Sequence, residues 1–277
     1  MIKIYRQLIL LTTLCICSAS LSAQTYRILI SNDDGIDSPL LAALQQELAK
    51  LPNVDVVVSA PNDNQSGSSM SSIGGPTVVD RYYRDRSFFG YAVHGRPSNA
   101  VMFGLQVLGR DDAFDLVVSG INRGANVGDV SHASGTIGAA MRALSLGVPA
   151  IAISQEVEGV NTEASAKFAA QLVVRYQRQG APEGVLISIN IPAGELRGVA
   201  VRPMGDSYLQ TGSFELIDES GNRQTYERER IRVPSTDEST DTYAYQQGYI
   251  TLTPLKFDWT AHGLIDEVKS WDLQLVD

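Results

Sequence analysis

The chain contains very little cysteine and histidine. Its two cysteines, Cys15 and Cys17, both lie close to the N-terminus of the 277-residue sequence. If that segment is removed on maturation, no cysteine remains, which excludes a disulfide framework, a thiolate nucleophile and a cysteine-based zinc site. The three histidines stand far apart and match no His-Glu-x-x-His pattern, so a histidine-based zinc site has little support.

Positive charge is also scarce. The sequence has 22 lysine and arginine residues against 31 aspartate and glutamate residues, which gives a formal net charge of -9. This balance argues against a surface for nucleic-acid polymers, whose binding depends on clustered lysine and arginine side chains. Small anionic substrates stay open, because a metal ion and backbone amides can supply positive charge locally.

The apolar run near the N-terminus is too short for a secure membrane-spanning helix. Met1–Arg6 carries two cations and no acid, Leu8–Cys17 is mostly apolar, and Ser18–Ala23 is rich in small residues. This order predicts a secretory signal peptide, residues 1–23, cleaved before Gln24. We therefore expect an exported protein, periplasmic or secreted, without a stable membrane span after cleavage. An uncleaved anchor and a buried N-terminal element are the alternatives.

Most of the remaining chain alternates short apolar runs with stretches that carry apolar residues at helical spacing. With 44% hydrophobic residues it can bury a large core, and repeated strand–helix units predict an α/β fold, a doubly wound and mostly parallel sheet. The core domain is expected over residues 24–204. The expected strands are 27–31, 54–58, 88–93, 114–120, 150–154 and 185–190, and the expected helices are 38–50, 98–108, 134–146 and 163–178.

The C-terminal part, residues 205–277, has a different character. Residues 205–241 contain turns, charges and short β-like pieces but no clear helix, which predicts an extended β-hairpin arm. A closing strand at 249–253 and a closing helix at 262–273 are expected to complete the same domain. Because such arms often pair with another copy of the chain, we expect a homodimer or homotetramer formed through the arm.

Polar residues follow three of the expected strands: Asn32–Gly35, Pro61–Gly67 and Ser119–Gly124. In the first group Asp33 and Asp34 are adjacent, and two buried carboxylates repel each other unless a cation lies between them. Loops that leave the carboxyl ends of parallel strands share one sheet edge, so their oxygen atoms predict a site for a hard cation. For any one loop, ordinary turn chemistry with a helix N-cap is the alternative.

The stretch Ser134-Gly135-Thr136 opens one of the expected helices. Free backbone amides and the helix dipole attract anions to such a position, so these residues form a candidate phosphate seat. A cation site beside a phosphate seat indicates phosphoryl chemistry. An ordinary N-cap explains the same residues equally well.

Several motifs, in this order and spacing, resemble those of the survival protein E (SurE) family of metal-dependent 5'/3'-nucleotidases. The resemblance extends to the strand near the C-terminus and therefore covers nearly the whole chain after the expected signal peptide. The motifs are Ile30-Ser31-Asn32-Asp33-Asp34-Gly35, Ala60-Pro61 with Ser66-Gly67, Val118-Ser119-Gly120-Ile121-Asn122, Ser134-Gly135-Thr136, Gly248 to Leu255 and Thr260-Ala261-His262.

The resemblance implies a Rossmann-like core and hydrolysis of nucleoside 5'- and 3'-monophosphates with one divalent cation, Mg²⁺ or Mn²⁺. It also implies a swapped C-terminal element in a dimer or tetramer. Asp33 and Asp34 are the implied catalytic residues, and the sequence leaves open whether a water molecule or an aspartate attacks phosphorus. The implied metal ligands are Asp33, Asp34, Ser66 and Asn122, and the implied phosphate-binding residues are Asn64, Gly67, Ser134, Gly135 and Thr136.

This chain departs from the family pattern beside the expected site. The family's second loop usually carries basic residues where this chain has Asp63 and Gln65. Arg96 is a candidate accessory residue that replaces this charge, with a plain surface arginine as the alternative. His132 is a candidate proton donor, with a place in the pocket wall or on the surface as the alternative.

Two other functions are compatible with these residues. The first is a broad-specificity, exported, acid-type phosphatase with little nucleotide preference, which also takes other phosphomonoesters. The second is a non-catalytic nucleotide-binding or assembly protein on the same fold, which the altered second loop would favour. Phosphate release from different substrates, with and without metals, separates these possibilities.

Overall fold

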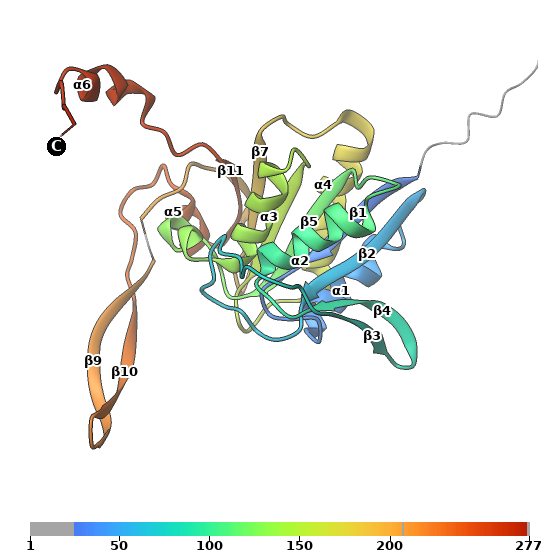
Figure 1. The fold of residues 1–277 in the computed structure, drawn as a ribbon, viewed down its shortest axis with the longest axis horizontal. Coiled ribbons are helices and arrows are strands. Elements are labelled where there is room, and N and C mark those ends of the chain that lie inside the picture. Colours follow the sequence, from blue (N-terminus) through green and yellow to red (C-terminus); the bar gives the residue numbers. More distant parts are fainter. Residues whose placement is uncertain (1–24, 207, 276–277) are drawn as a thin grey trace, which may run out of the picture.

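The computed structural model describes residues 25–206 and 208–275. The predicted signal peptide, residues 1–23, lies outside the described residues. Figure 1 shows a central sheet with helices packed against it, a long hairpin that projects from one side, and a C-terminal segment that leaves the body of the protein.

Within the described residues the central sheet has nine strands in the order β3-β4-β2-β1-β5-β6-β7-β11-β8. The run from β4 to β7 is parallel, whereas β3 and β11 run antiparallel to β4 and β7. This confirms the predicted mostly parallel α/β sheet. The strands are β1 Tyr26–Ser31, β2 Val54–Pro61, β3 Val79–Arg84, β4 Ser87–Val93, β5 Leu116–Arg123, β6 Ala150–Gln155, β7 Val185–Ile191, β8 Gly198–Val201 and β11 Tyr249–Lys256.

Helices cover both faces of the sheet. Alternate residues of a strand point to opposite faces, so Ile28 and Ile30 of β1 join the core beneath α1 and α4, whereas Leu29 joins the core beneath α2 and α3. All three side chains are fully buried. The helices are α1 Pro39–Leu48, α2 Pro97–Phe103, α3 Gly135–Ser145 and α4 Thr162–Gln179, and a π-helical turn, Gly104–Leu108, follows α2.

The described part of the chain contains no helix that is both long and apolar enough to cross a bilayer.

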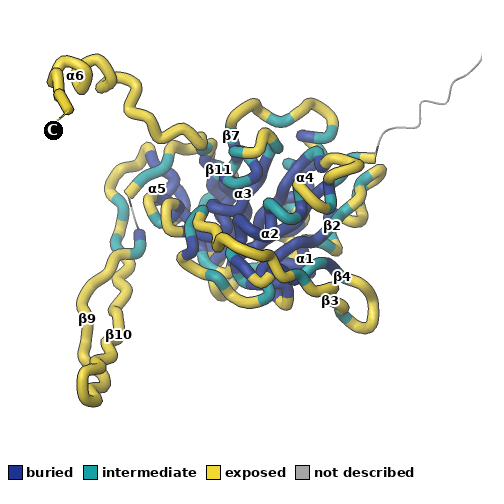
Figure 2. The backbone as a smooth tube through the Cα atoms, viewed as in Figure 1, coloured by how far each residue is buried: buried dark blue, intermediate teal, exposed yellow. Residues whose placement is uncertain are grey.

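The predicted arm is present as a two-stranded antiparallel hairpin, β9 Leu209–Ser220 and β10 Arg223–Arg232. Nearly every residue of both strands is exposed (Figure 2). At the base of the arm, Arg232 forms an ion pair of 3.2 Å with Glu156, which follows β6. The arm is therefore attached at its base while its length faces solvent.

Several expected boundaries were wrong. The strands β3 and β8 and the short helix α5, Asp241–Gln246, were not predicted, because short edge elements carry little apolar periodicity. The strand β5 runs to Arg123, so Asn122 lies in a strand and not in a loop.

The expected closing helix at 262–273 is present only in part. This segment forms a 3-10 turn, His262–Leu264, and a short helix, α6 Ile265–Lys269. Both are exposed and lie away from the sheet (Figures 1 and 2). A helix without a packing surface is marginal in water, which explains why its apolar spacing does not yield a long helix.

Candidate active site

The candidate site begins at the carboxyl end of β1, where a tight turn presents two acids. Asn32 is fully buried, and its side chain donates to Gly35 O at 2.9 Å and accepts from Gly35 N at 3.2 Å. Gly35 has φ +99°, and a Cβ there would lie 3.0 Å from the carbonyl carbon of Asp63. Because only glycine fits this turn easily, Asp33 and Asp34 are held in a rigid turn.

Asp34 connects two other segments of the chain to this turn. One carboxylate oxygen accepts from Asn64 Nδ2 at 3.4 Å, and the other accepts from the backbone amide of Arg123 at 3.1 Å. Partial burial raises the pKa of Asp34, and the hydrogen bond and charge of Arg123 oppose that shift. A single side chain therefore joins the loop after β2 to the end of β5.

Asp33 connects the turn to the start of α3. Its side chain is almost fully buried, and Thr136 Oγ1 donates a hydrogen bond to its Oδ1. Burial is the main cause that raises the pKa of Asp33 to about 6; the Thr136 hydrogen bond lowers it, and the charge of Asp34 adds to the rise. A Cβ on Gly135 would come within 2.8 Å of Asp33 Oδ2, so the first turn of α3 lies directly against the carboxylate.

The β2–β3 loop, residues 62–78, contacts both the β1 turn and α3. The amide of Gln65 donates to Asp33 O at 2.7 Å, and the amide of Ser69 donates to Ala133 O at 3.1 Å. A Cβ on Gly138 would lie 1.9 Å from Ser69 O, so α3 and the loop are in backbone contact. These contacts place exposed Ser66 and Gly67 at the edge of the site.

The donor atoms fit a hard divalent cation. Among the described residues, neither Asp33 nor Asp34 has a lysine, arginine or histidine side chain within ion-pair distance. Asn122 Nδ2 donates to Gly124 O at 2.6 Å, which leaves its Oδ1 available. Carboxylate, amide and hydroxyl oxygens suit Mg²⁺, Mn²⁺ or Ca²⁺. No group of three or more histidine, cysteine or acidic side chains lies together in the described part.

The three residues of the predicted phosphate seat already make hydrogen bonds within the protein. Ser134 is the N-cap of α3, and its hydroxyl accepts from the Ile137 amide at 3.2 Å. The Gly135 amide is a backbone donor to Asp33, and the Thr136 hydroxyl is bonded to the same side chain. Ser134 is therefore an ordinary N-cap, as the alternative interpretation expected. The start of the helix also faces the carboxylates, as a phosphate-binding role requires. Gly67 makes no described contact with this helix start, and its role in binding phosphate stays a prediction.

The two accessory residues lie in different surroundings. Arg96 precedes α2, and its Nη1 donates to Gln65 Oε1 in the β2–β3 loop at 2.7 Å. The exposed ring of His132 stands edge-on to Trp259 at 5.9 Å and lines a cavity of about 660 Å³ with Met141 and Met204. The role of His132 as a proton donor stays a prediction, and its contacts match the alternative place in a pocket wall.

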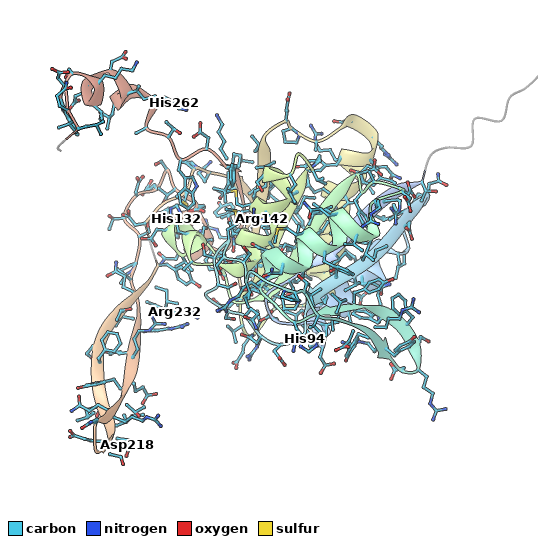
Figure 3. The ribbon with its side chains drawn as sticks, viewed as in Figure 1. His94, His132, Arg142, Asp218, Arg232 and His262 are labelled. Carbon is cyan, nitrogen blue, oxygen red and sulfur yellow. The ribbon has the colours of Figure 1, made fainter. Side chains whose placement is uncertain are left out.

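The three histidines, His94, His132 and His262, lie well apart (Figure 3). His94 contacts Asp80 and His262 contacts Asp258, each at 2.7 Å. His94 and His262 are thus each paired with a nearby aspartate and not with another histidine.

Sequence reasoning missed the contacts that assemble the site. It did not assign the Thr136 hydroxyl to Asp33, the Gln65 amide to Asp33 O, or the Arg123 amide to Asp34. The positions were visible as polar residues after strands, but only the register of β1 with β5 brings the end of β5 beside Asp34.

The chain is similar to proteins of one family along most of its length. The family model described as "Survival protein SurE" matches residues 28–211. A 5'-nucleotidase SurE of Chlorobaculum tepidum is 36% identical over 256 residues, which cover 91% of this chain and 96% of that protein. A 5'-nucleotidase SurE 1 of Thermus thermophilus is 36% identical over 251 residues, which cover 87% of this chain and 95% of that protein. The solved structure of the Sure protein from Aquifex aeolicus matches with a TM-score of 0.76 at 31% identity, and covers 89% of this chain and 100% of that chain.

The pKa of Asp33 predicts how the stability of the metal-free protein changes with pH. The folded-state pKa of about 6 lies above the ordinary aspartate value of 3.8. The folded state therefore holds this proton more tightly, and stability falls as pH rises from about 4 to above 6, by roughly 3 kcal/mol. In chelator, the free energy of unfolding measured in urea at several pH values should show this fall. Asp33→Asn should reduce it.

Asp37→Asn is the matched control, because Asp37 lies in the same segment but is exposed. It should keep the pH dependence of the unaltered chain. Equal pH dependence in Asp33→Asn and the unaltered chain would contradict the assignment.

Proposed function

We propose that this chain, which belongs to the survival protein SurE family of phosphoric monoester hydrolases, hydrolyses nucleoside 5'-monophosphates, and their 3' isomers, with one divalent cation. The observation that carries the proposal is the adjacent pair of buried Asp33 and half-buried Asp34, which contacts the start of α3, the β2–β3 loop and the end of β5. The relatives named above are called 5'-nucleotidases, and this supports a nucleoside monophosphate as the substrate.

Asp33, Asp34, Ser66 and Asn122 are the residues that would hold the cation, with Mg²⁺ or Mn²⁺ as the preferred ion for their oxygen atoms. A bound cation would neutralise the two carboxylates and withdraw charge from the phosphoryl oxygens. The raised pKa values of both acids support this assignment, because their charged forms are unfavourable in the buried turn without a compensating positive charge.

Residues of the chain would accept the proton, hold the surrounding segments in place and orient the phosphoryl group. Asp33 accepts from the Thr136 hydroxyl and the Gly135 amide, and we assign proton transfer from an attacking water molecule to its carboxylate. Both oxygens of Asp34 accept hydrogen bonds, which suits a residue that keeps the surrounding segments in place. The positive end of the α3 dipole, with the Thr136 amide, would orient the phosphoryl group.

The direct test is phosphate release from nucleoside 5'- and 3'-monophosphates and from phenyl phosphate, each with Mg²⁺, with Mn²⁺ and with chelator. Asp33→Asn should lower the metal-dependent rate by about 100-fold or more, because it removes the proton acceptor and one charge but little volume. Asp37→Asn, an exposed acid in the same segment, should retain the rate of the unaltered chain.

The outcomes of that assay separate the alternatives. Full activity in Asp33→Asn, or release that survives complete chelation, would contradict the site. Equal rates on phenyl phosphate would indicate a broad-specificity phosphatase, and no release with either metal would indicate a non-catalytic binding protein.

We also propose that the chain forms a homodimer or homotetramer through the arm. An isolated two-stranded hairpin is marginally stable in water, yet this one carries Phe214 and Ile217 with 63% and 56% of their surfaces exposed. The C-terminal segment likewise exposes Trp259 and Trp271. A second copy that covers these apolar side chains would stabilise both elements.

Replacing Phe214 and Ile217 together by glutamate tests this assembly. The unaltered chain should sediment as a dimer or tetramer in analytical ultracentrifugation, and the double variant should sediment as a monomer with an intact core by circular dichroism. Thr211→Glu with Thr225→Glu adds the same charge to the arm without removing apolar surface, and should stay assembled. A monomeric unaltered chain would rule the assembly out.

Export is a further proposal, supported by the charged, apolar and small-residue order of residues 1–23. Expressed in full in a bacterial host, the protein should be recovered outside the cytoplasm with Gln24 as its first residue by N-terminal sequencing. A matched chain that starts at Gln24 should stay in the cytoplasm. Full-length protein that remains uncleaved in the cytoplasm would refute export.

A further inference from the structure

The first turn of α2 holds the β2–β3 loop at three places. Ser98 Oγ donates to Met70 O at 3.0 Å. Asn99 is almost fully buried, and its side chain accepts from the Ile73 amide and donates to Ile73 O, both at 2.9 Å. The third contact is the one from Arg96 to Gln65, and it reaches the part of the loop beside the two acids.

Gln65 occupies a central position in that part of the loop. Its amide donates to Asp33 O, and its neighbours are Asn64, which contacts Asp34, and Ser66. Its side-chain oxygen accepts from Arg96 Nη1 at 2.7 Å. A continuous path of hydrogen bonds therefore runs from α2 through Arg96 and Gln65 to the backbone of the β1 turn.

The guanidinium of Arg96 is half-buried and has no carboxylate within 4.0 Å in the described ranges, 25–206 and 208–275. The guanidinium instead donates to a neutral amide oxygen, Gln65 Oε1. A charged donor makes a short and directional hydrogen bond to such an acceptor. Ser66 and Gly67, which follow Gln65, are exposed, so little packing holds this end of the loop in place.

We propose that Arg96 is a positioning residue that fixes the β2–β3 loop through Gln65, and so keeps Ser66 beside Asp33 and Asp34 for cation binding. The inference rests on the proposed function, because Ser66 has this role only if a cation binds there. Arg96 acts through Gln65 and not by touching the substrate. Residues that orient metal ligands in this way typically change metal affinity when they are replaced.

Mn²⁺ binding measured by isothermal titration calorimetry, without substrate, tests the inference. Arg96→Ala and Gln65→Leu should each weaken Mn²⁺ binding by about 10-fold. The double variant should be no weaker than either single variant, because both remove the same contact. Arg96→Lys, which keeps a charged donor, should recover part of the affinity. Arg110→Ala, an exposed arginine after the π-helical turn, is the matched control and should bind Mn²⁺ normally.

A second readout separates positioning from direct contact with the substrate. At saturating Mn²⁺, Arg96→Ala should regain most of its kcat, and its KM for a nucleoside monophosphate should be close to that of the unaltered chain. Thermal unfolding in chelator should show that each variant is folded.

Three results would overturn the inference alone: normal Mn²⁺ binding by Arg96→Ala, weak binding by Arg96→Ala with normal binding by Gln65→Leu, or additive losses in the double variant. The second of these would indicate that Arg96 affects the cation site by a route other than Gln65. Failure of the proposed function looks different, because the unaltered chain itself would then show no saturable Mn²⁺ binding and no metal-dependent phosphate release.

Discussion

Two adjacent carboxylates at the end of a buried strand are the constraint on which the site depends. In the metal-free protein their burial disfavours charge, as the pKa of about 6 at Asp33 shows. The same two side chains also hold the surrounding segments, since Asp33 accepts from α3 and Asp34 accepts from the β2–β3 loop and from β5. The groups that oppose folding electrostatically are thus the groups that assemble the sheet edge.

Close backbone packing makes this arrangement possible. Gly135 brings the first turn of α3 against Asp33, and Gly138 brings the next turn against Ser69 O. In most helices alanine is more favourable than glycine by about 1 kcal/mol. Here a methyl group at Gly138 would lie 1.9 Å from the carbonyl oxygen of Ser69. The close contact between α3 and the loop therefore requires glycine, despite its lower helix propensity.

The sequence alone was sufficient for the fold class, because the apolar runs of β1, β5 and β6 are long, buried and regularly separated by helices. It also located the polar ends of the strands. It could not assign partners, such as Thr136 for Asp33 or Gln65 for Arg96, because those contacts depend on register and helix placement. Apolar spacing misled at 262–273, where no packing surface within the described chain supports a long helix.

The order of strands has a consequence for the integrity of the molecule. The arm lies between β8 and β11 in sequence, yet β11 is inserted between β7 and β8 in the sheet. A protease that cut the exposed hairpin would leave two fragments whose strands remain hydrogen-bonded on both sides of β11. Strand pairing, and not the covalent link through the arm, is therefore what joins β11 to the rest of the sheet.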